Sequence, residues 1–323
     1  MRVETVMNPA ANRMTRNSRR PKKVTINPTW TRLFTGDASG ATASAGSINT
    51  AEVAKFAKLS SEWWSPDGPF SLLHRMNPAR VGYIRDQVEQ RGIASMYETE
   101  HSVLSNVNRR AYPLAGMQMA DIGSGGGILS EALFRLGANV TGVDAALENV
   151  RTATYHASQA PDFVESTEHP GSLQYRATTV EQLVSPSTSN VQSLAGTFDA
   201  VCALEVIEHV NQPREFLRNC SALLRPGGLL FLSTISRTPF AYLLTVTLAE
   251  DVLRLVDRGT HDFNKYIRPD EMCEALRSPD IGCEPLDVRG CVYLPWMNTW
   301  KVLDGRLGSL ETQANYIMVA RKA

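Results

Sequence analysis

The alternation of strand-like and helix-like segments from residue 117 to residue 234 is the feature that most constrains the fold. We expect strands at 117–122, 139–143, 173–177, 198–204 and 229–234, with helices at 128–136, 147–158 and 213–224. Strands that alternate with helices at this spacing predict a parallel, doubly wound α/β sheet. Two later apolar runs, 285–293 and 315–320, would close a seven-stranded, mostly parallel sheet.

The whole chain divides into three parts. Residues 1–46 form a basic segment, 47–116 an N-terminal helical cap, and 117–323 the α/β domain with a helical insertion at 236–280 after the fifth strand. In the cap we expect a helix capped by Asn49 or Thr50 and a second one from about Pro78 to Gln90. The stretch 91–116 is less regular and is expected to include a short helix.

The net charge of zero is the sum of two unequal parts. The chain has 33 basic and 33 acidic residues; residues 1–46 hold eight basic and two acidic ones, which leaves 25 against 31 for the remainder. A basic segment rich in Arg, Ser, Thr and Ala, without a long apolar run, is typical of a mitochondrial transit peptide, with a disordered basic tail as the alternative. The acidic remainder disfavours nucleic acid as a partner.

The cysteine spacing and the length of the apolar runs argue against disulfide-rich, cysteine-zinc and membrane-spanning proteins. The five cysteines are scattered and form no C-x-x-C pair, so neither a disulfide framework nor a cysteine zinc site is indicated. No apolar run approaches 18 residues, so any membrane contact is expected to be peripheral.

A glycine-rich loop follows the first expected strand. Residues 121–127 read D-I-G-S-G-G-G, and glycines allow the backbone to turn sharply and to approach a ligand closely. Asp144, 21 residues after Gly123, ends the second strand, where a carboxylate can accept both hydroxyls of a ribose. Because Ile128 stands where the dinucleotide fingerprint has its third glycine, a NAD-dependent oxidoreductase is the less favoured alternative.

The pattern D-x-G-x-G-x-G resembles the cofactor loop of class I S-adenosylmethionine methyltransferases. The L-R-P-G-G run at 224–228 resembles the turn that leads into the fifth strand of the same enzymes. The two motifs in this order predict a Rossmann-like class I methyltransferase fold, with Gly123, Gly125 and Asp144 binding S-adenosylmethionine.

Three polar residues follow the fourth expected strand. Glu205, Glu208 and His209 lie at the carboxyl end of a parallel strand, where such sheets carry their chemistry. Spacings of three and four would place them on one side of a helical turn, where they could hold Mg²⁺ or a transition metal. The alternative is that the carboxylates are solvated and that His209 acts alone as a general base or merely packs.

Beyond these motifs, the chain from about Asn49 to its end resembles the ubiquinone (coenzyme Q) biosynthesis O-methyltransferases, and in particular the mitochondrial ones. The match rests on E-V-A-K-F at 52–56, E-W-W at 62–64, L-H-R-M-N-P-A-R at 73–80, the glycine loop, 205–210 and G-T-H-D at 259–262. The W-W and L-H-x-x-N-P-x-R blocks are the more specific, because no general cofactor fold requires them.

The resemblance implies a role for each matching residue. Arg80 would contact the cofactor, through its methionine carboxylate, and Leu204 would lie at the adenine. Family members use the E-x-x-E-H cluster for Mg²⁺, which favours the metal interpretation of Glu205, Glu208 and His209. Glu208 and His209 would then be the catalytic residues.

The resemblance also implies a substrate and a location. The enzyme would methylate a catechol hydroxyl of 3,4-dihydroxy-5-polyprenylbenzoate and of demethylubiquinol, with metal-assisted deprotonation; another small aromatic substrate is the alternative. It would lie peripherally on the matrix side of the inner mitochondrial membrane, in a multi-subunit ubiquinone biosynthesis complex.

Residues 239–258 suit an interfacial helix or hydrophobic lid, or equally a helix packed against the sheet or in a dimer. The intact set of predicted site residues speaks against a non-catalytic scaffold.

Overall fold

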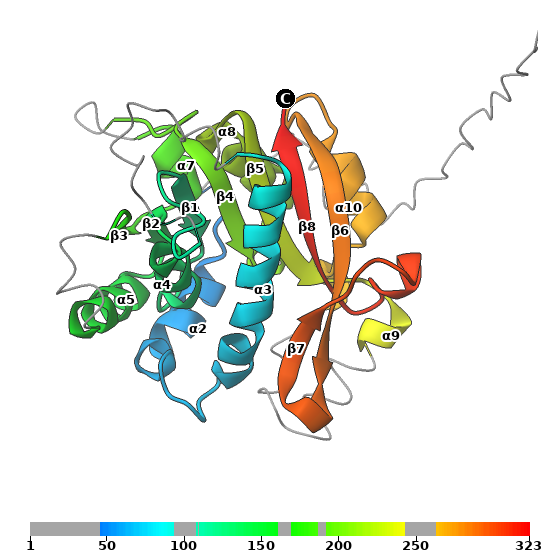
Figure 1. Ribbon diagram of the computed structural model, residues 1–323, viewed down its shortest axis with the longest axis horizontal. Coiled ribbons are helices and arrows are strands. Elements are labelled where there is room, and N and C mark those ends of the chain that lie inside the picture. Colours follow the sequence, from blue (N-terminus) through cyan, green and yellow to red (C-terminus); the bar gives the residue numbers. More distant parts are fainter. Residues whose placement is uncertain (1–45, 94–107, 109, 161–168, 187–191, 243–262) are drawn as a thin grey trace, which may run out of the picture.

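A single mixed sheet with helices on both faces forms the body of the protein (Figure 1). The computed structural model describes residues 46–93, 108, 110–160, 169–186, 192–242 and 263–323. The strands are β1 (Gln118–Ile122), β2 (Asn139–Asp144), β3 (Ser172–Ala177), β4 (Phe198–Leu204), β5 (Leu224–Ile235), β6 (Cys283–Leu294), β7 (Thr299–Val302) and β8 (Asn315–Lys322). The helices of four or more residues are α2 (Thr50–Lys58), α3 (Ser71–Gln90), α4 (Ile128–Arg135), α5 (Leu147–Gln159), α7 (Val180–Val184), α8 (Pro213–Leu223), α9 (Pro239–Tyr242) and α10 (Pro269–Leu276).

The order of the strands fixes where a ligand can bind. The sheet runs β3-β2-β1-β4-β5-β8-β6-β7, and its first five strands are parallel. β8 is antiparallel to both of its neighbours, and β7 is antiparallel to β6. The connections reverse direction between β1 and β4, and ligands of open α/β sheets bind at the carboxyl ends of the strands beside such a switch point.

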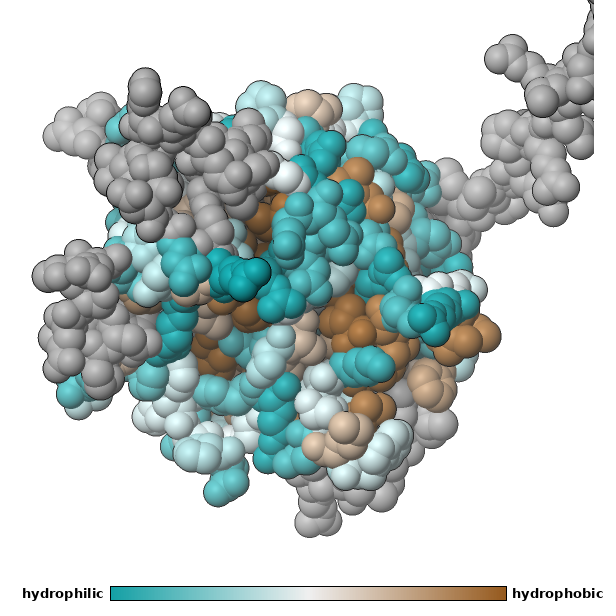
Figure 2. Space-filling view, viewed as in Figure 1, coloured by the Kyte–Doolittle hydropathy of each residue, from teal (hydrophilic) through white to brown (hydrophobic). Residues whose placement is uncertain are grey.

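The sheet is buried on both faces. Along β5, Leu229 and Phe231 belong to one apolar core with α3 and α4, whereas Leu230 and Leu232 belong to another with α8 and α10. This two-sided burial explains why the strands are continuous apolar runs rather than alternating ones. Figure 2 shows the covering helix α3 from outside, with a largely hydrophilic surface and apolar residues on either side of it.

The sequence predicts this fold class, and the structure confirms it with one additional strand. The sheet has eight strands where we expect seven, because the short β7 pairs with the end of β6. Four residues with no apolar alternation carry too little pattern to reveal such an edge strand. The expected five parallel strands all lie within two residues of their predicted starts, except that β5 begins at Leu224 rather than at Leu229.

The N-terminal cap differs from expectation in one helix. Asn49 caps α2, since its Oδ1 accepts from the backbone N–H groups of Ala51 and Glu52 at 3.1 and 3.4 Å. The second helix, expected from Pro78, begins at Ser71 and contains Pro78 in its interior. A proline there removes one backbone hydrogen bond, and the buried face of α3 against the sheet compensates for it.

Several predictions concern residues outside the described part of the chain. These are the transit peptide, apart from Gly46, most of the irregular stretch 91–116, most of the segment 239–258, of which the structure describes 239–242, and the G-T-H-D block at 259–262. Among the described residues, no helix is both long and apolar enough to cross a bilayer.

Candidate active site

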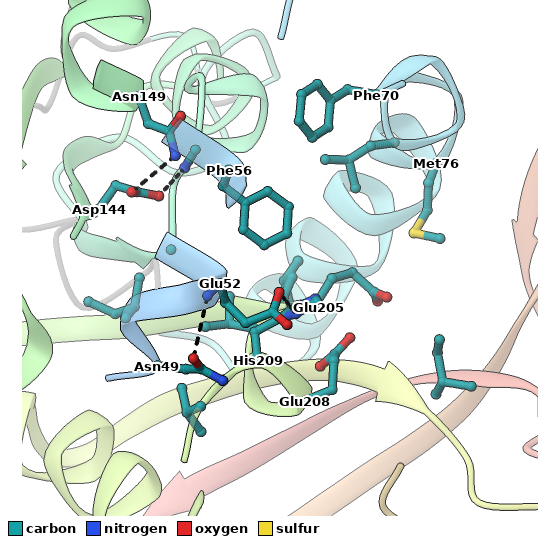
Figure 3. Close-up of a pocket in the computed structure, with 18 of the residues that line it drawn as sticks. Asn49, Glu52, Phe56, Phe70, Met76, Asp144, Asn149, Glu205, Glu208 and His209 are labelled. Carbon is teal, nitrogen blue, oxygen red and sulfur yellow. Dashed lines mark hydrogen bonds and ion pairs between the residues drawn. The ribbon is translucent and has the colours of Figure 1, made fainter. Parts of the chain in front are cut away.

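A cavity of about 880 Å³ opens at the carboxyl ends of β1, β2 and β4. Helix α2 and the first turns of α3 form one wall, and β6, β7 and α9 contribute the far wall. Figure 3 shows two groups of polar side chains in it. We call the region around Asp144 and Asn149 the Asp144 end, and the region around Glu52, Glu205, Glu208 and His209 the Glu208 end.

Backbone geometry shapes the Asp144 end. Gly123, Gly125 and Gly127 have φ values of +75°, +52° and +90°, which side chains rarely tolerate. A Cβ on Gly123 would also lie 2.5 Å from Cγ2 of Val206, so the loop can pass there only as glycine. The sequence prediction that this loop needs glycine is confirmed.

The Asp144 carboxylate is held by three hydrogen bonds. Its Oδ2 accepts from the N–H of Gly125 at 2.9 Å, and its Oδ1 accepts from Ala146 N at 2.8 Å and from Asn149 Nδ2 at 3.2 Å. Burial raises the pKa of Asp144, although these three hydrogen bonds oppose the shift. The carboxylate lines the cavity in a fixed orientation, where it can accept hydrogen bonds from a diol.

Arg80 lies behind the cavity wall rather than on it. The side chain is 3% exposed, and its Nη2 donates to Asn77 Oδ1 at 3.3 Å. Its Nε has no hydrogen-bond partner among the described residues. Burial lowers the pKa of Arg80, and the negative charges of Glu205 and Asp121 oppose this. A buried guanidinium with a free donor can receive an anion, but Arg80 is not among the residues that line the cavity.

Asp121 begins the glycine loop and lies beneath it. Ser130 Oγ donates to Asp121 Oδ2 at 2.6 Å. Burial raises the pKa of Asp121 to about 6, against the opposing effects of the Ser130 hydrogen bond and the Arg80 charge. This carboxyl therefore exchanges its proton close to neutral pH while it supports the loop from inside.

Glu205 has an unusual backbone at the start of the Glu208 end. Its φ is +58°, which is uncommon for a residue with a side chain. Its N–H donates to the carbonyl of Ser233 at 3.0 Å, and its Oε1 accepts from Ser233 Oγ at 2.6 Å. The neighbouring strand β5 thus holds both the backbone and the carboxylate of Glu205.

Glu208 and His209 lie in a short 3-10 helix, Ile207–His209. Glu208 is 8% exposed, and its Oε2 accepts from Thr234 Oγ1 at 2.9 Å. Burial raises its pKa to about 8, and the nearby charge of Glu205 adds to the shift. His209 Nδ1 lies 3.1 Å from Oε2 of Glu52 on α2, and burial lowers the pKa of His209.

The three residues of the predicted cluster all line the cavity, but they do not surround one point. Within the described part of the chain, no group of three or more His, Cys, Asp or Glu side chains has the geometry of a metal site. The prediction that Glu205, Glu208 and His209 share one side of a helical turn is wrong, because Glu205 is left-handed and the turn begins only at Ile207. Each side chain instead bonds to a different protein group.

Most of the other predicted site residues line the cavity, and their roles as cofactor contacts stay predictions. Gly123, Gly125, Asp144 and Leu204 line it together with the three residues above. The sequence did not reveal Glu52 as the partner of His209, since 157 residues separate them and no motif links the two. Nor did it single out Asn149, although a polar residue five positions after Asp144 in the following helix was a usable signal.

The comparisons with known proteins agree with one another at the sequence level. A family model described as "Methyltransferase domain" matches residues 97–281, more than half of the chain. The ubiquinone biosynthesis O-methyltransferase of Caulobacter sp. (strain K31) is 40% identical over 285 residues, covering 88% of this chain and 98% of the relative. The enzyme of the same name from Cereibacter sphaeroides is 38% identical over 257 residues, covering 80% and 92%.

Solved structures show a more distant likeness. The magnesium protoporphyrin IX methyltransferase of Synechocystis PCC 6803 with bound SAH is 17% identical, with a TM-score of 0.42, over 76% of this chain and 85% of that one. The sequence relatives are far closer, and they cover nearly their whole length. By these relatives, the chain belongs to the ubiquinone biosynthesis O-methyltransferase family.

Proposed function

We propose that this protein transfers the methyl group of S-adenosylmethionine to a catechol hydroxyl of 3,4-dihydroxy-5-polyprenylbenzoate and of demethylubiquinol. The observation that carries the proposal is one cavity with a nucleoside-type site at the Asp144 end and an acid/base group at the Glu208 end. Methyl transfer requires a sulfonium and an oxygen nucleophile in line within one enclosed space.

At the Asp144 end, the fixed carboxylate of Asp144 accepts the two ribose hydroxyls, and the glycine loop allows close approach of the cofactor. Leu204 contributes an apolar surface beside it. Arg80 does not line the cavity, but its Nε has no partner among the described residues, and the family resemblance assigns it to the methionine carboxylate. Each of these roles follows the family resemblance.

At the Glu208 end, the phenolic proton has to be removed, because phenols have a pKa near 10 and attack a sulfonium slowly when neutral. The lowered pKa of His209 keeps the imidazole neutral at pH 7. With Nδ1–H donating to Glu52, Nε2 is left as the acceptor for the proton. His209 therefore serves as the general base, and Glu208 lies beside it.

The proposal includes Mg²⁺ because the cavity offers carboxylates that suit this ion. Carboxylate oxygens are what Mg²⁺ prefers, and the repulsion between Glu205 and Glu208 would be relieved by a cation. The family resemblance assigns it to Glu205, Glu208 and His209, but Nε2 of His209 cannot both hold an ion and accept the proton. The two carboxylates would therefore hold the ion, which would lower the pKa of a bound catechol oxygen. The side chains do not surround a common point, so the proton transfer above is derived from His209 alone.

The test is a methyl-transfer assay. Purified protein is incubated with labelled S-adenosylmethionine and a prenylated dihydroxybenzoate, with and without a chelator, and the label is followed into the acceptor. We expect transfer to one catechol hydroxyl, and loss of transfer with chelator if Mg²⁺ takes part. Cofactor binding without transfer to this acceptor, but with transfer to another small aromatic compound, would overturn the proposed substrate.

Location and partners follow from the same proposal. We infer a peripheral protein on the matrix side of the inner mitochondrial membrane, delivered by a transit peptide in residues 1–46 and associated with a multi-subunit ubiquinone biosynthesis complex. The basic composition of that segment supports the first part. Exposed apolar side chains near the cavity support membrane contact, namely Phe240 of α9 and Trp296 and Met297 after β6.

Two experiments examine these points. A fluorescent protein fused to residues 1–46 should enter mitochondria; a cytosolic signal would contradict the transit peptide. A variant lacking 239–258 should bind liposomes less well in flotation, whereas undiminished binding would exclude this segment as the anchor.

A further inference from the structure

The indole of Trp63 lies directly against the glycine loop. The side chain is 7% exposed, lines the cavity, and stacks on Phe70 with ring centroids 3.7 Å apart and 6° between the planes. A Cβ on Gly125 would lie 2.3 Å from Cη2 of Trp63, and one on Gly126 would lie 2.4 Å from its Cβ. The indole therefore occupies the space that a side chain on either glycine would need.

The same indole is the first member of a chain of hydrogen bonds that ends at the ribose site. Trp63 Nε1 donates to Asn149 Oδ1 at 2.9 Å, and Asn149 Nδ2 donates to Asp144 Oδ1 at 3.2 Å. Asn149 is 1% exposed, so water does not compete for its amide. The other oxygen of Asp144 accepts from Gly125, one of the two glycines beneath the indole.

The direction of this chain follows from chemistry. An indole N–H can only donate, so Asn149 has to turn its oxygen toward Trp63 and its NH₂ toward Asp144. Without the indole donor, the Asn149 oxygen would lose its partner, and only the bond to Asp144 would hold the amide. The amide could then tilt away from its present orientation, and the third donor to the Asp144 carboxylate would be weaker.

Trp64 provides a natural comparison. Its Nε1 also donates to the loop, to the carbonyl of Gly126 at 2.8 Å, and its ring stacks on His156 at 3.4 Å. It is not among the residues that line the cavity, and none of its described hydrogen bonds leads to Asp144. The two adjacent tryptophans thus both support the loop, but only Trp63 reaches the carboxylate.

We propose that Trp63 is a positioning residue for the cofactor, which fixes the Asn149 amide and thereby aims the Asp144 carboxylate at the nucleoside diol. The proposal rests on the proposed function, because it takes S-adenosylmethionine as the ligand of this end. It gives the N-terminal cap a specific task in cofactor binding: η1 (Ser60–Glu62) leads directly into Trp63, so the cap completes a site otherwise built by the α/β domain.

The experiment compares two ligands by calorimetry. S-adenosylhomocysteine and its 2′-deoxy analogue are titrated into the wild type and into Trp63→Phe, which keeps an aromatic ring on Phe70 and removes the N–H. We expect the dissociation constant of S-adenosylhomocysteine to rise roughly tenfold, the usual effect of weakening one hydrogen bond to a charged group. The dissociation constant of the 2′-deoxy analogue should rise less than about twofold, since this analogue lacks one of the hydroxyls that donate to Asp144.

Matched variants keep the test decisive. Trp64→Phe should raise the dissociation constants of both ligands equally, and by less than about threefold. Asn149→Ala leaves the indole in place and breaks the chain of hydrogen bonds, so it should reproduce the ligand selectivity of Trp63→Phe even if the latter folds poorly. Thermal unfolding of each variant reports on folding separately.

Three outcomes are distinguishable. If Trp63→Phe and Asn149→Ala lose affinity for S-adenosylhomocysteine but not for its 2′-deoxy analogue, the proposal is supported. An equal loss of affinity for both ligands in Trp63→Phe and in Asn149→Ala would overturn the proposal and leave Trp63 as a packing residue of the loop. Failure of the wild type to bind S-adenosylhomocysteine would contradict the proposed function instead.

Discussion

The two ends of the cavity are built from residues at very different separations along the chain. At the Asp144 end, Gly125 and Asn149 contact Asp144 from 19 and 5 residues away. At the Glu208 end, Glu52 contacts His209 from 157 residues away. Apart from Trp63 of the cap, which reaches the Asp144 end through Asn149, the first end is a property of one βαβ unit. The second end forms only when the N-terminal cap and distant strands come together.

The two ends also differ in electrostatics. The Asp144 carboxylate receives three hydrogen-bond donors, two of them backbone N–H groups that cannot be removed by a rotamer change. Glu205 and Glu208 each receive one side-chain hydroxyl and repel each other. Fixed donors orient the carboxylate of the first end, whereas the second end places two carboxylates near each other.

The largest expected effect separates catalysis from cofactor binding. Glu208→Ala and His209→Ala should each lower kcat by about a thousandfold, the range for loss of a general acid or base. The affinity for S-adenosylhomocysteine should stay within about twofold of the wild type, because neither side chain contacts Asp144. Assay and calorimetry measure the two quantities, with the exposed Glu89→Ala as the control. Full activity in either variant would contradict the assignment.

A reciprocal change should affect the other end. Asp144→Ala removes the acceptor of three hydrogen bonds and of the ribose hydroxyls, so the affinity for S-adenosylhomocysteine should fall at least about 100-fold. Saturating cofactor should restore part of the rate, since the Glu208 end is unchanged. Unaltered binding would show that the nucleoside lies elsewhere.

The third prediction concerns stability beneath the glycine loop. The pKa of Asp121 is raised from 3.8 to about 6, so the folded protein binds this proton more tightly than the unfolded chain. The resulting stabilisation is fully present below about pH 4 and is lost as the pH rises through about 6, at most about 3 kcal/mol. Urea unfolding of the wild type and of Asp121→Asn between pH 4 and 8 measures it. A difference between the two that does not vary with pH would contradict the assigned pKa.

The smallest effect is expected at the edge of the cavity. Ser47 N donates to Glu181 Oε1 at 3.1 Å, its hydroxyl donates to the same oxygen, and both Ser47 and Glu181 line the cavity. Ser47→Ala removes the hydroxyl bond and should raise the cofactor dissociation constant by about two- to fivefold, with less than about 1 kcal/mol lost in stability. Calorimetry with S-adenosylhomocysteine is the measurement, and an unchanged dissociation constant would show that this contact does not restrain the cofactor.

The contrast between the ends explains what could be predicted from the sequence. Gly123, Gly125 and Asp144 follow a local strand–turn–helix pattern, and such a pattern fixes backbone geometry without knowledge of the rest of the fold. The left-handed backbone of Glu205 could not be foreseen, because its partner Ser233 comes from a neighbouring strand. For the same reason the helical spacing of Glu205, Glu208 and His209 was misleading.

Long-range packing also explains the other differences between the expected and the observed helices and strands. The first turn of α3 at Ser71 precedes the helix signal at Pro78, and its Leu73 packs against the distant cluster of Trp63, Phe70 and Ile128. Strand β7 depends on pairing with β6, and the far wall of the cavity, with Tyr293 and Trp300, follows from that pairing.

The most direct test of the account is a crystal structure with S-adenosylhomocysteine bound. The division of the cavity predicts both ribose hydroxyls within hydrogen-bond distance of the Asp144 carboxylate and the sulfur directed toward His209. A nucleoside bound at the Glu208 end, or bound without contact to Asp144, would contradict it.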